Sequence, residues 1–439
     1  MQREVRTPLQ SLQSTASLQL LKWFCLALVT GALAGTASAV FLSSLSWVTQ
    51  TREANLWLIA LLPLAGLVVG GVYHYFGQEV RRGNDLLLDE IHETQKTIPV
   101  RMAPFALLGT LATHLFGGSA GREGTALQMG ASLADQLSAP LRLTAEDRRI
   151  ILMAGVSGGF GSVFGTPLAG AVFGLEFVAI GRVRYHAIFP CFVASIAADY
   201  VTTAWGVGHT HYHVPFVPDF TLVGLLAAIG AGIAFGLAAM TFAKMTHGAK
   251  ALFAKMIKYP PMRPVVGGAI VAFAVWLLGT TRYIGLGIPT IVESFTTELP
   301  PWDFAAKLVF TAVTLGAGFQ GGEVTPLFYV GSTLGSALSP LLPFPTPVLA
   351  AMGFVAVWCA AANTPLAGIL MAIELFGPEI GVYASVACVV SYLFSGHTGI
   401  YTAQRIDISK NPNIDIQEGM TVSELERSGV SRVPKTGDL

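Results

Sequence analysis

The sequence predicts an all-α integral membrane protein, and composition and hydrophobic patterning lead to this prediction. Of the 439 residues, 53% are hydrophobic and only 12% are charged, whereas a typical soluble domain has roughly 25% charged residues. The mean hydropathy of +0.60 extends over the whole chain rather than one anchor segment, so lipid is its natural solvent. The 48 glycines agree with this environment, because glycine is commoner in membrane helices than in soluble ones.

Apolar segments recur along the chain in two sets. The first set covers 18–48, 56–76, 103–117, 126–139, 150–180 and 186–205, and the second covers 221–243, 264–279, 304–319, 327–342, 347–375 and 380–394. Several are shorter than the roughly 20 residues that span a bilayer, or are interrupted by Gly and Pro. Such broken segments are tolerated at membrane depth where protein or a watery cavity surrounds them, and in matching halves they indicate a transport site.

The first apolar segment allows two interpretations. Arg3 and Arg6 precede it, and residues 36–39 resemble a signal-peptidase site. The apolar pattern nevertheless continues to Trp47, which makes it long enough to span a bilayer. We expect a retained first helix, with a cleaved signal peptide as the alternative.

Charge and cysteine usage limit the possible partners. The net charge is zero, so nucleic-acid binding is not indicated. The four cysteines lie far apart in apolar runs, which argues against both a disulfide framework and a metal motif. Lys and Arg cluster at Arg81–Arg82, between Lys244 and Lys258, and around Arg405 and Lys410, and the positive-inside rule makes these segments cytoplasmic.

The segments and charges together predict three regions. Residues 1–17 form a cytoplasmic N-terminal segment, residues 18–408 form the transmembrane domain, and residues 409–439 form a short cytoplasmic tail, too small for a regulatory domain.

The transmembrane region contains an internal duplication, with halves at roughly 56–205 and 221–405. Three motifs recur at a displacement of about 200 residues: 121–125 with 321–325, 130–133 with 331–334, and Thr-Pro-Leu-Ala-Gly at 166–170 with an identical copy at 364–368. We therefore expect two homologous halves that meet at one site. The repeat itself does not reveal how the halves are oriented.

Two glutamates in the repeated glycine motifs, Glu123 and Glu323, carry the candidate chemistry. Each precedes an apolar helical stretch, and helix starts bind anions through unpaired N–H groups and the helix dipole. A carboxylate there can occupy the anion site itself and leave on protonation, which exchanges a proton for an anion. An ionisable residue at membrane depth is a functional hypothesis by default. The alternative is a pair of helix caps outside the bilayer.

Several other polar residues allow a functional and a structural interpretation. Thr325 and Tyr401 carry neutral hydroxyl donors, which suit a monovalent anion, although either could simply be a packing residue. Asn84, after Gly83, could open another anion-facing helix, whose acidic end at 89–93 we expect to be a solvated cap.

The remaining polar groups have structural interpretations. We expect Glu176 and Glu374, which close the Thr-Pro-Leu-Ala-Gly copies, to bind backbone N–H groups. The alternating His209, His211 and His213 could bind a metal. We expect a solvent loop instead, because no neighbouring carboxylate or cysteine helps them.

These motifs resemble those of the CLC family of chloride channels and anion/proton antiporters over about residues 18–408. The resemblance rests on Gly-Arg-Glu-Gly at 121–124, on Gly321-Gly322 with Pro326, and on Tyr401. It implies a fold of two inverted-topology repeats with many short, broken and tilted helices. It also implies a homodimer with one pathway per subunit and an anion held by helix N-termini, including the backbones of Gly124 and Val324. Glu123 matches the gating glutamate of the family, and Tyr401 matches the tyrosine that donates its hydroxyl to the central anion.

Departures from the chloride-transporting pattern resemble the fluoride-exporting bacterial branch of the family. Asn84 replaces the usual anion-contacting serine, Thr125 replaces a proline, and Phe177 occupies the position of the internal proton-relay glutamate. In the fluoride-exporting branch, the residues matching Glu323 and Thr325 belong to the ion pathway. The resemblance implies a fluoride/proton antiporter of the bacterial inner membrane that confers fluoride resistance and uses neither a cofactor nor a metal.

Two rival functions remain open. A chloride/proton antiporter or a voltage-type chloride channel of the same family would be expected to keep the serine at position 84 or the acid at position 177. A membrane enzyme belongs to another class: Gly155-Val156-Ser157-Gly158 fits an intramembrane serine protease, which needs a histidine base. The surrounding glycines favour close helix packing instead. We expect no enzymatic activity.

Overall fold

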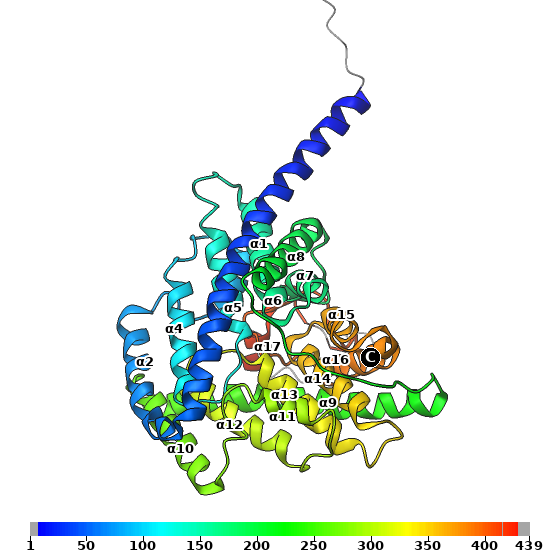
Figure 1. Ribbon diagram of the computed structural model, residues 1–439. Coiled ribbons are helices and arrows are strands. Elements are labelled where there is room, and N and C mark those ends of the chain that lie inside the picture. The colour runs from blue at the N-terminus through cyan, green and yellow to red at the C-terminus, as the bar shows by residue number, and fades with distance from the viewer. Residues whose placement is uncertain (1–7, 415, 429–439) are drawn as a thin grey trace, which may run out of the picture.

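A computed structural model describes residues 8–414 and 416–428, which are folded almost entirely as helices (Figure 1). The elements of the first half are α1 (Pro8–Ala54), η1 (Leu56–Leu61), α2 (Leu62–Phe76), α3 (Asn84–His92), α4 (Met102–Leu115), α5 (Glu123–Asp135), α6 (Ala145–Phe164), α7 (Pro167–Glu176), β1 (Ala179–Ile180), η2 (Tyr185–Ala187) and α8 (Ile188–Ala204).

The second half repeats the helical pattern and adds a small C-terminal lobe. Its elements are α9 (Leu222–Met256), α10 (Met262–Leu278), α11 (Ile288–Glu293), α12 (Asp303–Ala317), α13 (Val324–Leu338), α14 (Thr346–Ala362), α15 (Pro365–Phe376), η3 (Pro378–Ile380), α16 (Gly381–Phe394), β2 (Arg405–Ile406), β3 (Met420–Thr421) and α17 (Val422–Ser428). The three strands have two residues each, so the predicted all-α class is confirmed.

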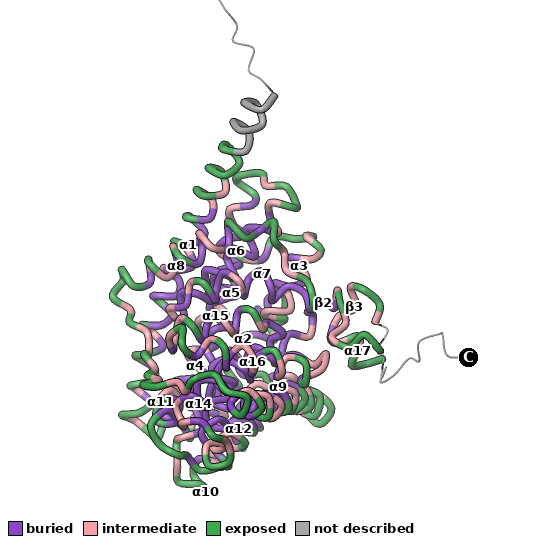
Figure 2. Tube along the Cα trace, turned by 90° about the vertical axis from the view of Figure 1, so that its right-hand side faces the viewer, coloured by how far each residue is buried: buried purple, intermediate pink, exposed green. Residues whose placement is uncertain are grey.

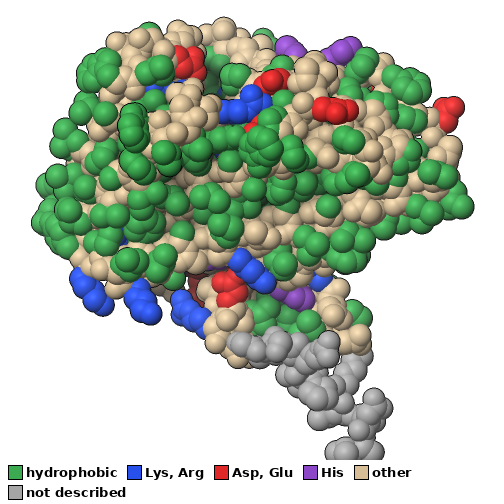
Figure 3. All heavy atoms as spheres, turned by 90° about the horizontal axis from the view of Figure 1, so that it is seen from below, with side chains coloured by type: hydrophobic (Ala, Val, Ile, Leu, Met, Phe, Trp, Pro, Cys, Tyr) green, Lys and Arg blue, Asp and Glu red, His purple; other side chains and the backbone are tan. Residues whose placement is uncertain are grey.

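The surface and the helix lengths are those of a protein embedded in a membrane. Four apolar segments of the described chain are long enough to cross a bilayer: Ser17–Ala54, Leu56–Phe76, Tyr185–Ala204 and Leu222–Met256. Six shorter apolar helices accompany them, as the broken segments of the sequence predict. Figure 3 shows a broad belt of hydrophobic side chains, with Lys and Arg gathered along one edge beside the C-terminal residues. The positive-inside rule predicts that this edge faces the cytoplasm.

The expected first helix is present and longer than its apolar core. α1 begins at Pro8 and packs against α5, α6 and α8, where Gly31 and Gly35 approach the backbone of α8. A side-chain carbon on Gly35 would lie 2.4 Å from the carbonyl oxygen of Ala198. The tight packing supports a retained helix over a cleaved signal. Residues 1–7 of the predicted N-terminal segment lie outside the described residues.

Equivalent glycines pack the central helices in both halves. A side-chain carbon on Gly130 of α5 would lie 2.5 Å from the Gly155 carbonyl oxygen of α6. In the second half, the corresponding distance from Gly331 of α13 to the Gly353 oxygen of α14 is 2.0 Å. Small residues allow helix backbones to approach closely in a membrane, where packing rather than hydrophobicity drives association. The duplication is thus visible in three dimensions.

Glu176 and Glu374 join the two halves through reciprocal helix caps. The carboxylate of Glu176 accepts hydrogen bonds from the backbone N–H groups of Leu366 and Ala367, both at 3.0 Å, at the start of α15. The Glu374 carboxylate accepts hydrogen bonds from Leu168 and Ala169, at 2.9 and 2.8 Å, at the start of α7. The expected structural role is confirmed: each helix carries at its end the carboxylate that caps the other.

The acidic end of α3 is only partly solvated, which corrects the expectation of a solvated cap. Glu90 is buried, and Arg148 donates hydrogen bonds both to Glu90, at 3.0 Å, and to Asp135, at 2.7 Å. This buried cluster ties α3 to α5 and α6. Removing one member of such a pair typically costs about 3–5 kcal/mol, because an uncompensated charge stays buried.

The described C-terminal residues form a small lobe at one side of the helical body (Figure 2). β2 pairs in parallel with β1 and antiparallel with β3, and Ile180, Ile406 and Val422 form a separate apolar cluster. Lys410 donates hydrogen bonds to Asn363, Tyr392 and Ser395. The predicted tail is therefore docked at its start, and residues 415 and 429–439 lie outside the described residues.

Candidate functional site

The two repeated glycine motifs meet at the centre of the protein. Gly121 and Gly322 exchange backbone hydrogen bonds of 2.6 and 2.8 Å in an antiparallel bridge. α5 begins at Glu123, and α13 begins at Val324 with Glu323 as its N-cap. Both expected helix starts are confirmed. The antiparallel bridge brings the starts of the two helices together.

The carboxylate of Glu123 is held by donors from both halves. The backbone N–H of Val324 donates to Oε1 at 2.5 Å, and the Thr325 hydroxyl donates to Oε2 at 2.8 Å. The backbone N–H of Arg122 also donates to Oε2, at 2.9 Å. Glu123 is only 1% exposed. A negative group therefore lies at the N-terminus of α13, where unpaired N–H groups and the helix dipole stabilise anions.

The glycines around Glu123 leave the space that its carboxylate fills. A side-chain carbon on Gly322 would lie 2.2 Å from the Glu123 Oε1, and one on Gly121 would lie 2.3 Å from the same atom. Any larger residue at either position would displace the carboxylate. The glycines of the repeated motif thus have a steric role that the spacing alone does not reveal.

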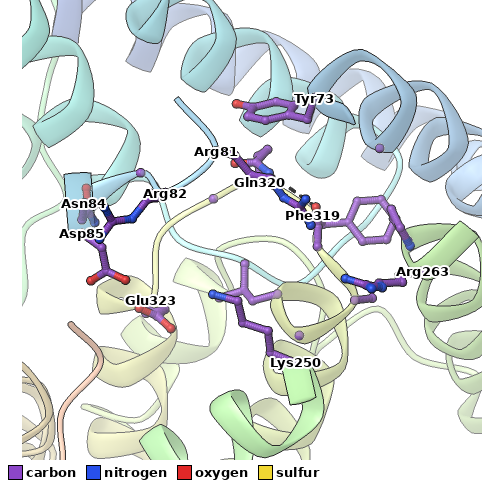
Figure 4. Close-up of a pocket in the computed structure, with 18 of the residues that line it drawn as sticks. Tyr73, Arg81, Arg82, Asn84, Asp85, Lys250, Arg263, Phe319, Gln320 and Glu323 are labelled. Atoms are coloured by element: carbon purple, nitrogen blue, oxygen red, sulfur yellow. Dashed lines mark hydrogen bonds between the residues drawn. The ribbon is translucent and has the colours of Figure 1, made fainter. Parts of the chain in front are cut away.

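A cavity of about 240 Å³ adjoins this centre (Figure 4). Arg81, Arg82 and Lys250 line it, so the positive-inside rule predicts that it lies on the cytoplasmic side. Glu323, Asp85 and Lys250 line it, together with Asn84 and Tyr401. Figure 4 shows Glu323 and Asp85 on facing elements, with the Lys250 side chain rising from α9 toward them. Within the described residues, neither the Glu323 carboxylate nor the Tyr401 hydroxyl has a protein hydrogen bond. Both groups are therefore available to a ligand in the cavity.

Asn84 is oriented by Gln128, a residue that the sequence analysis did not identify. The side-chain amide of Gln128 donates to the Asn84 Oδ1 at 3.4 Å, which leaves the Asn84 Nδ2 as the free donor end. That nitrogen lies 3.2 Å from where a side-chain carbon on Gly124 would be, so it faces the start of α5. Gln128 follows Gly124 by four residues, so both lie on the same face of α5. This spacing was the sequence signal that could have placed Gln128 at the site.

The loop that carries Tyr401 is fixed to α3 and to an aromatic cluster. The Asp85 carboxylate accepts hydrogen bonds from the Thr402 hydroxyl, at 2.6 Å, and the Ala403 N–H, at 3.1 Å. The Tyr401 ring packs edge-on against Phe177, with centroids 5.1 Å apart. Phe177 is fully buried in this cluster, so an apolar ring occupies the position where the resemblance places a relay glutamate in chloride exchangers.

Two other sequence motifs lie in settings that favour their structural interpretations. The Ser157 hydroxyl is buried and donates to the Ala171 carbonyl at 3.4 Å. A side-chain carbon on Gly174 would lie 2.1 Å from this hydroxyl, which is the close helix packing expected of the glycine run. His209 lies 3.5 Å from Asp199, whereas His211 and His213 are exposed. A carboxylate does lie beside one of the histidines, although the sequence did not reveal it. It belongs to Asp199 of α8 and is close to His209.

The fold and this centre define a helical membrane protein of two inverted repeats that meet at opposed helix starts. Residues 65–396 match the voltage gated chloride channel family, and the chain belongs to this family, whose members include the CLC proteins. It is 57% identical over 412 residues to the "Chloride/fluoride channel protein" of Pseudomonas syringae pv. tomato, a match that covers 92% of this chain and 91% of the relative. It is 27% identical over 382 residues to the "H(+)/Cl(-) exchange transporter ClcA" of Vibrio vulnificus, with 80% and 81% covered.

Solved structures share the architecture. A crystal structure of a CLC-type fluoride/proton antiporter superposes with a TM-score of 0.86 at 34% identity, over 89% of this chain and 99% of the other. A slow cyanobacterial Cl⁻/H⁺ antiporter superposes with a TM-score of 0.75 at 21% identity, over 87% and 96% of the two chains. The second similarity shows the common fold. The CLC-type fold predicted from the sequence is confirmed.

Proposed function

We propose that the protein is a fluoride/proton antiporter that exports fluoride and thereby confers fluoride resistance. The observation that carries the proposal is the Glu123 carboxylate, which occupies the position of an anion between donors of Val324 and Thr325. A second glutamate, Glu323, lines the cytoplasmic cavity at the start of the same helix. The similarity to a CLC-type fluoride/proton antiporter and to a chloride/fluoride channel protein supports the same function.

The exchange follows from competition for one set of donors. A protonated Glu123 loses its negative charge and with it the charge-assisted hydrogen bonds from Val324 and Thr325, which are about twice as strong as neutral ones. An anion entering from the cavity then takes these donors, and its arrival favours the protonated, displaced glutamate. Each cycle therefore moves a proton and an anion in opposite directions.

The donor set suits fluoride, which is small and strongly hydrated. Replacing its water requires close donors, and the site offers the Asn84 amide, the Thr325 and Tyr401 hydroxyls, and the backbone N–H groups of Gly124 and Val324. Neutral donors compensate for lost hydration without trapping the ion as a fixed cation would. Fluoride also enters cells as its neutral conjugate acid, so a proton-coupled exporter meets the need to expel it. The rival function is chloride/proton exchange, which is favoured by the similarity to the Vibrio exchanger.

Halide selectivity tests the proposal directly. We expect proteoliposomes containing the purified protein to release fluoride at least tenfold faster than chloride, with protons moving in the opposite direction. Ion-selective electrodes and a pH electrode measure the three fluxes, and protein-free liposomes give the leak. Equal rates for fluoride and chloride would exclude the fluoride assignment and favour the rival exchanger.

Removing one hydroxyl donor should slow transport without unfolding the protein. A hydrogen bond to a charged group contributes about 1.5–3 kcal/mol, so Thr325→Val and Tyr401→Phe should each reduce fluoride flux by about tenfold or more. Thr333→Val is the matched control, because the Thr333 hydroxyl donates within α13 to the Tyr329 carbonyl. Unchanged flux in a monodisperse Thr325→Val, Tyr401→Phe double variant would exclude both residues from the ion pathway.

The proposal includes the setting of the transporter. We propose that it works as a homodimer in the bacterial inner membrane, in contact with lipid, with fluoride and protons as its only substrates. We propose no enzymatic activity, since the Ser157 hydroxyl is enclosed by helix packing. Labelling with a fluorophosphonate probe tests the last point, and stoichiometric modification of Ser157 would contradict it.

A further inference from the structure

A second cavity lies on the cytoplasmic face, apart from the transport pathway. Its volume is about 170 Å³, more than ten times the roughly 10–15 Å³ that one water needs. It shares no lining residue with the cavity at Glu323. The end of α3, the start of α6 and the segment from Val178 to His186 enclose it. Neither the resemblance nor the proposed antiport uses this cavity.

The lining of the second cavity is predominantly basic. Arg149, Arg184, His92 and His186 contribute to it, and Glu146 is its single carboxylate. Arg184 is 3.3 Å from the Asp407 carboxylate, which it shares with Arg182. Within the described residues, no carboxylate lies within ion-pair distance of Arg149. The positive charges of the two arginines that line the cavity are therefore only partly balanced by carboxylates.

Arg149 has a buried donor without a partner. One Nη donates to the His92 carbonyl at 3.1 Å, which fixes the side chain against the end of α3. The Nε of Arg149 is buried and has no hydrogen-bond partner in the described part of the chain. A buried unpaired donor is unfavourable, so the Arg149 guanidinium has hydrogen-bonding capacity that the described part of the chain does not fill.

The chemistry of the lining selects the ligand. Arginine presents a planar fork of N–H donors that matches the oxygens of a phosphate, and Arg–phosphate pairs are frequently bidentate. Two arginines on different elements, α6 and the segment before η2, can hold one tetrahedral anion from two sides. A halide is a single atom and would accept a hydrogen bond from only one N–H group of each guanidinium. The lining therefore fits a phosphate group better than the transported ion.

The cavity also lies at the level expected for lipid headgroups. Tyr185, beside Arg184, is 71% exposed, and Ile188 and Phe189 follow it as exposed apolar residues at the start of α8. Exposed tyrosines are typical of the membrane–water interface. Basic pockets between membrane helices on the cytoplasmic side are known to bind phosphate headgroups. A phosphate carried by a lipid could thus reach the cavity from the side, and a free phosphate could reach it from the cytosol.

We propose that the cavity between α3, α6 and η2 binds a phosphate group, carried by an anionic lipid or free in solution, through Arg149 and Arg184. The ligand accepts hydrogen bonds from the guanidinium groups of Arg149 and Arg184, both of which line the cavity. It contacts both the start of α6 and the loop that follows α7.

Binding to the detergent-purified full chain tests the proposal with three probes. The probes are dioctanoyl phosphatidic acid, inorganic phosphate and dioctanoylglycerol, which has the same acyl chains without phosphate. Native mass spectrometry and isothermal titration measure their binding. We expect phosphatidic acid to bind and dioctanoylglycerol not to bind. Binding of inorganic phosphate as well would identify a soluble ligand, whereas binding of the lipid alone would identify a headgroup site.

Variants then assign the binding to this cavity. Arg149→Gln and Arg184→Gln should each weaken binding at least tenfold. Arg182→Gln, which also removes a contact to Asp407 but lies outside the cavity, should stay within twofold of wild type. Arg184 lies in a partly exposed loop, so its variant remains informative even if Arg149→Gln fails to fold. The proposal is overturned if wild type binds neither phosphate probe, if dioctanoylglycerol binds equally well, or if Arg184→Gln binds as tightly as wild type.

Discussion

Replacing Glu123 with glutamine is expected to abolish proton movement while anions still cross. The glutamine side chain is neutral at every pH, so it resembles the protonated glutamate and cannot compete as a carboxylate for the Val324 and Thr325 donors. The donors are then free for the anion, and no group at this position titrates. In proteoliposomes with a fluoride gradient, we expect proton flux to fall at least tenfold, to the leak of protein-free vesicles.

The control for Glu123→Gln is Glu53→Gln, which changes an exposed glutamate whose contact is an ion pair with Arg52. Its proton and fluoride fluxes should match those of wild type. Normal proton-driven anion uptake by Glu123→Gln vesicles would show that the gate lies elsewhere. The buried, hydrogen-bonded carboxylate would then be a structural cap of α13.

Glu323 is expected to be nearly as important for exchange. An antiporter needs an acid that reaches the cytoplasmic side, and the position at Phe177 holds a buried phenyl ring. Glu323 lines the cytoplasmic cavity, and its carboxylate has no protein hydrogen bond within the described residues. Glu323→Gln and Glu323→Ala should therefore reduce coupled fluoride and proton flux at least tenfold in the same assay.

Glu323→Asp separates a proton-handling role from a steric one. Aspartate keeps the carboxylic acid and is itself a preferred N-cap residue, as position 323 requires. We therefore expect Glu323→Asp to retain more exchange than either neutral variant. Wild-type turnover in both Glu323→Gln and Glu323→Ala would exclude Glu323 from the proton pathway. It would leave the proposed role of Glu123 unaffected, because only the Glu123 carboxylate is held by the donors of Val324 and Thr325.

The sequence alone predicted features that depend on local pattern and on repetition. Composition and apolar segments predicted a membrane protein, and the repeated motifs predicted two related halves. The helix starts at Glu123 and Glu323 followed from carboxylates placed before apolar helical stretches, and the structure confirms both. The capping roles of Glu176 and Glu374 were also predictable, since a carboxylate buried in an apolar helix needs donors.

Long-range relations were decided by the tertiary structure. Glu123 and Thr325 are about 200 residues apart, and the antiparallel bridge between Gly121 and Gly322 brings them into contact. A sequence repeat is the same whether its copies are parallel or inverted, so the relative orientation of the halves could not be derived from it. The same holds for the second cavity, whose lining comes from segments that no motif connects.

Burial of charged and polar groups also depended on the tertiary structure. Glu90 lies in a charged run that is typical of a solvated cap, yet Arg148 from another helix binds it in the interior. Gln128 is one of several polar residues of α5, and its effect on Asn84 depends on how α5 packs against α3. The sequence by itself determined the membrane class, the duplication and the helix starts, because these depend on hydrophobicity and on neighbouring residues. The partners of each polar group were decided by the tertiary structure, because they lie on elements distant in the chain.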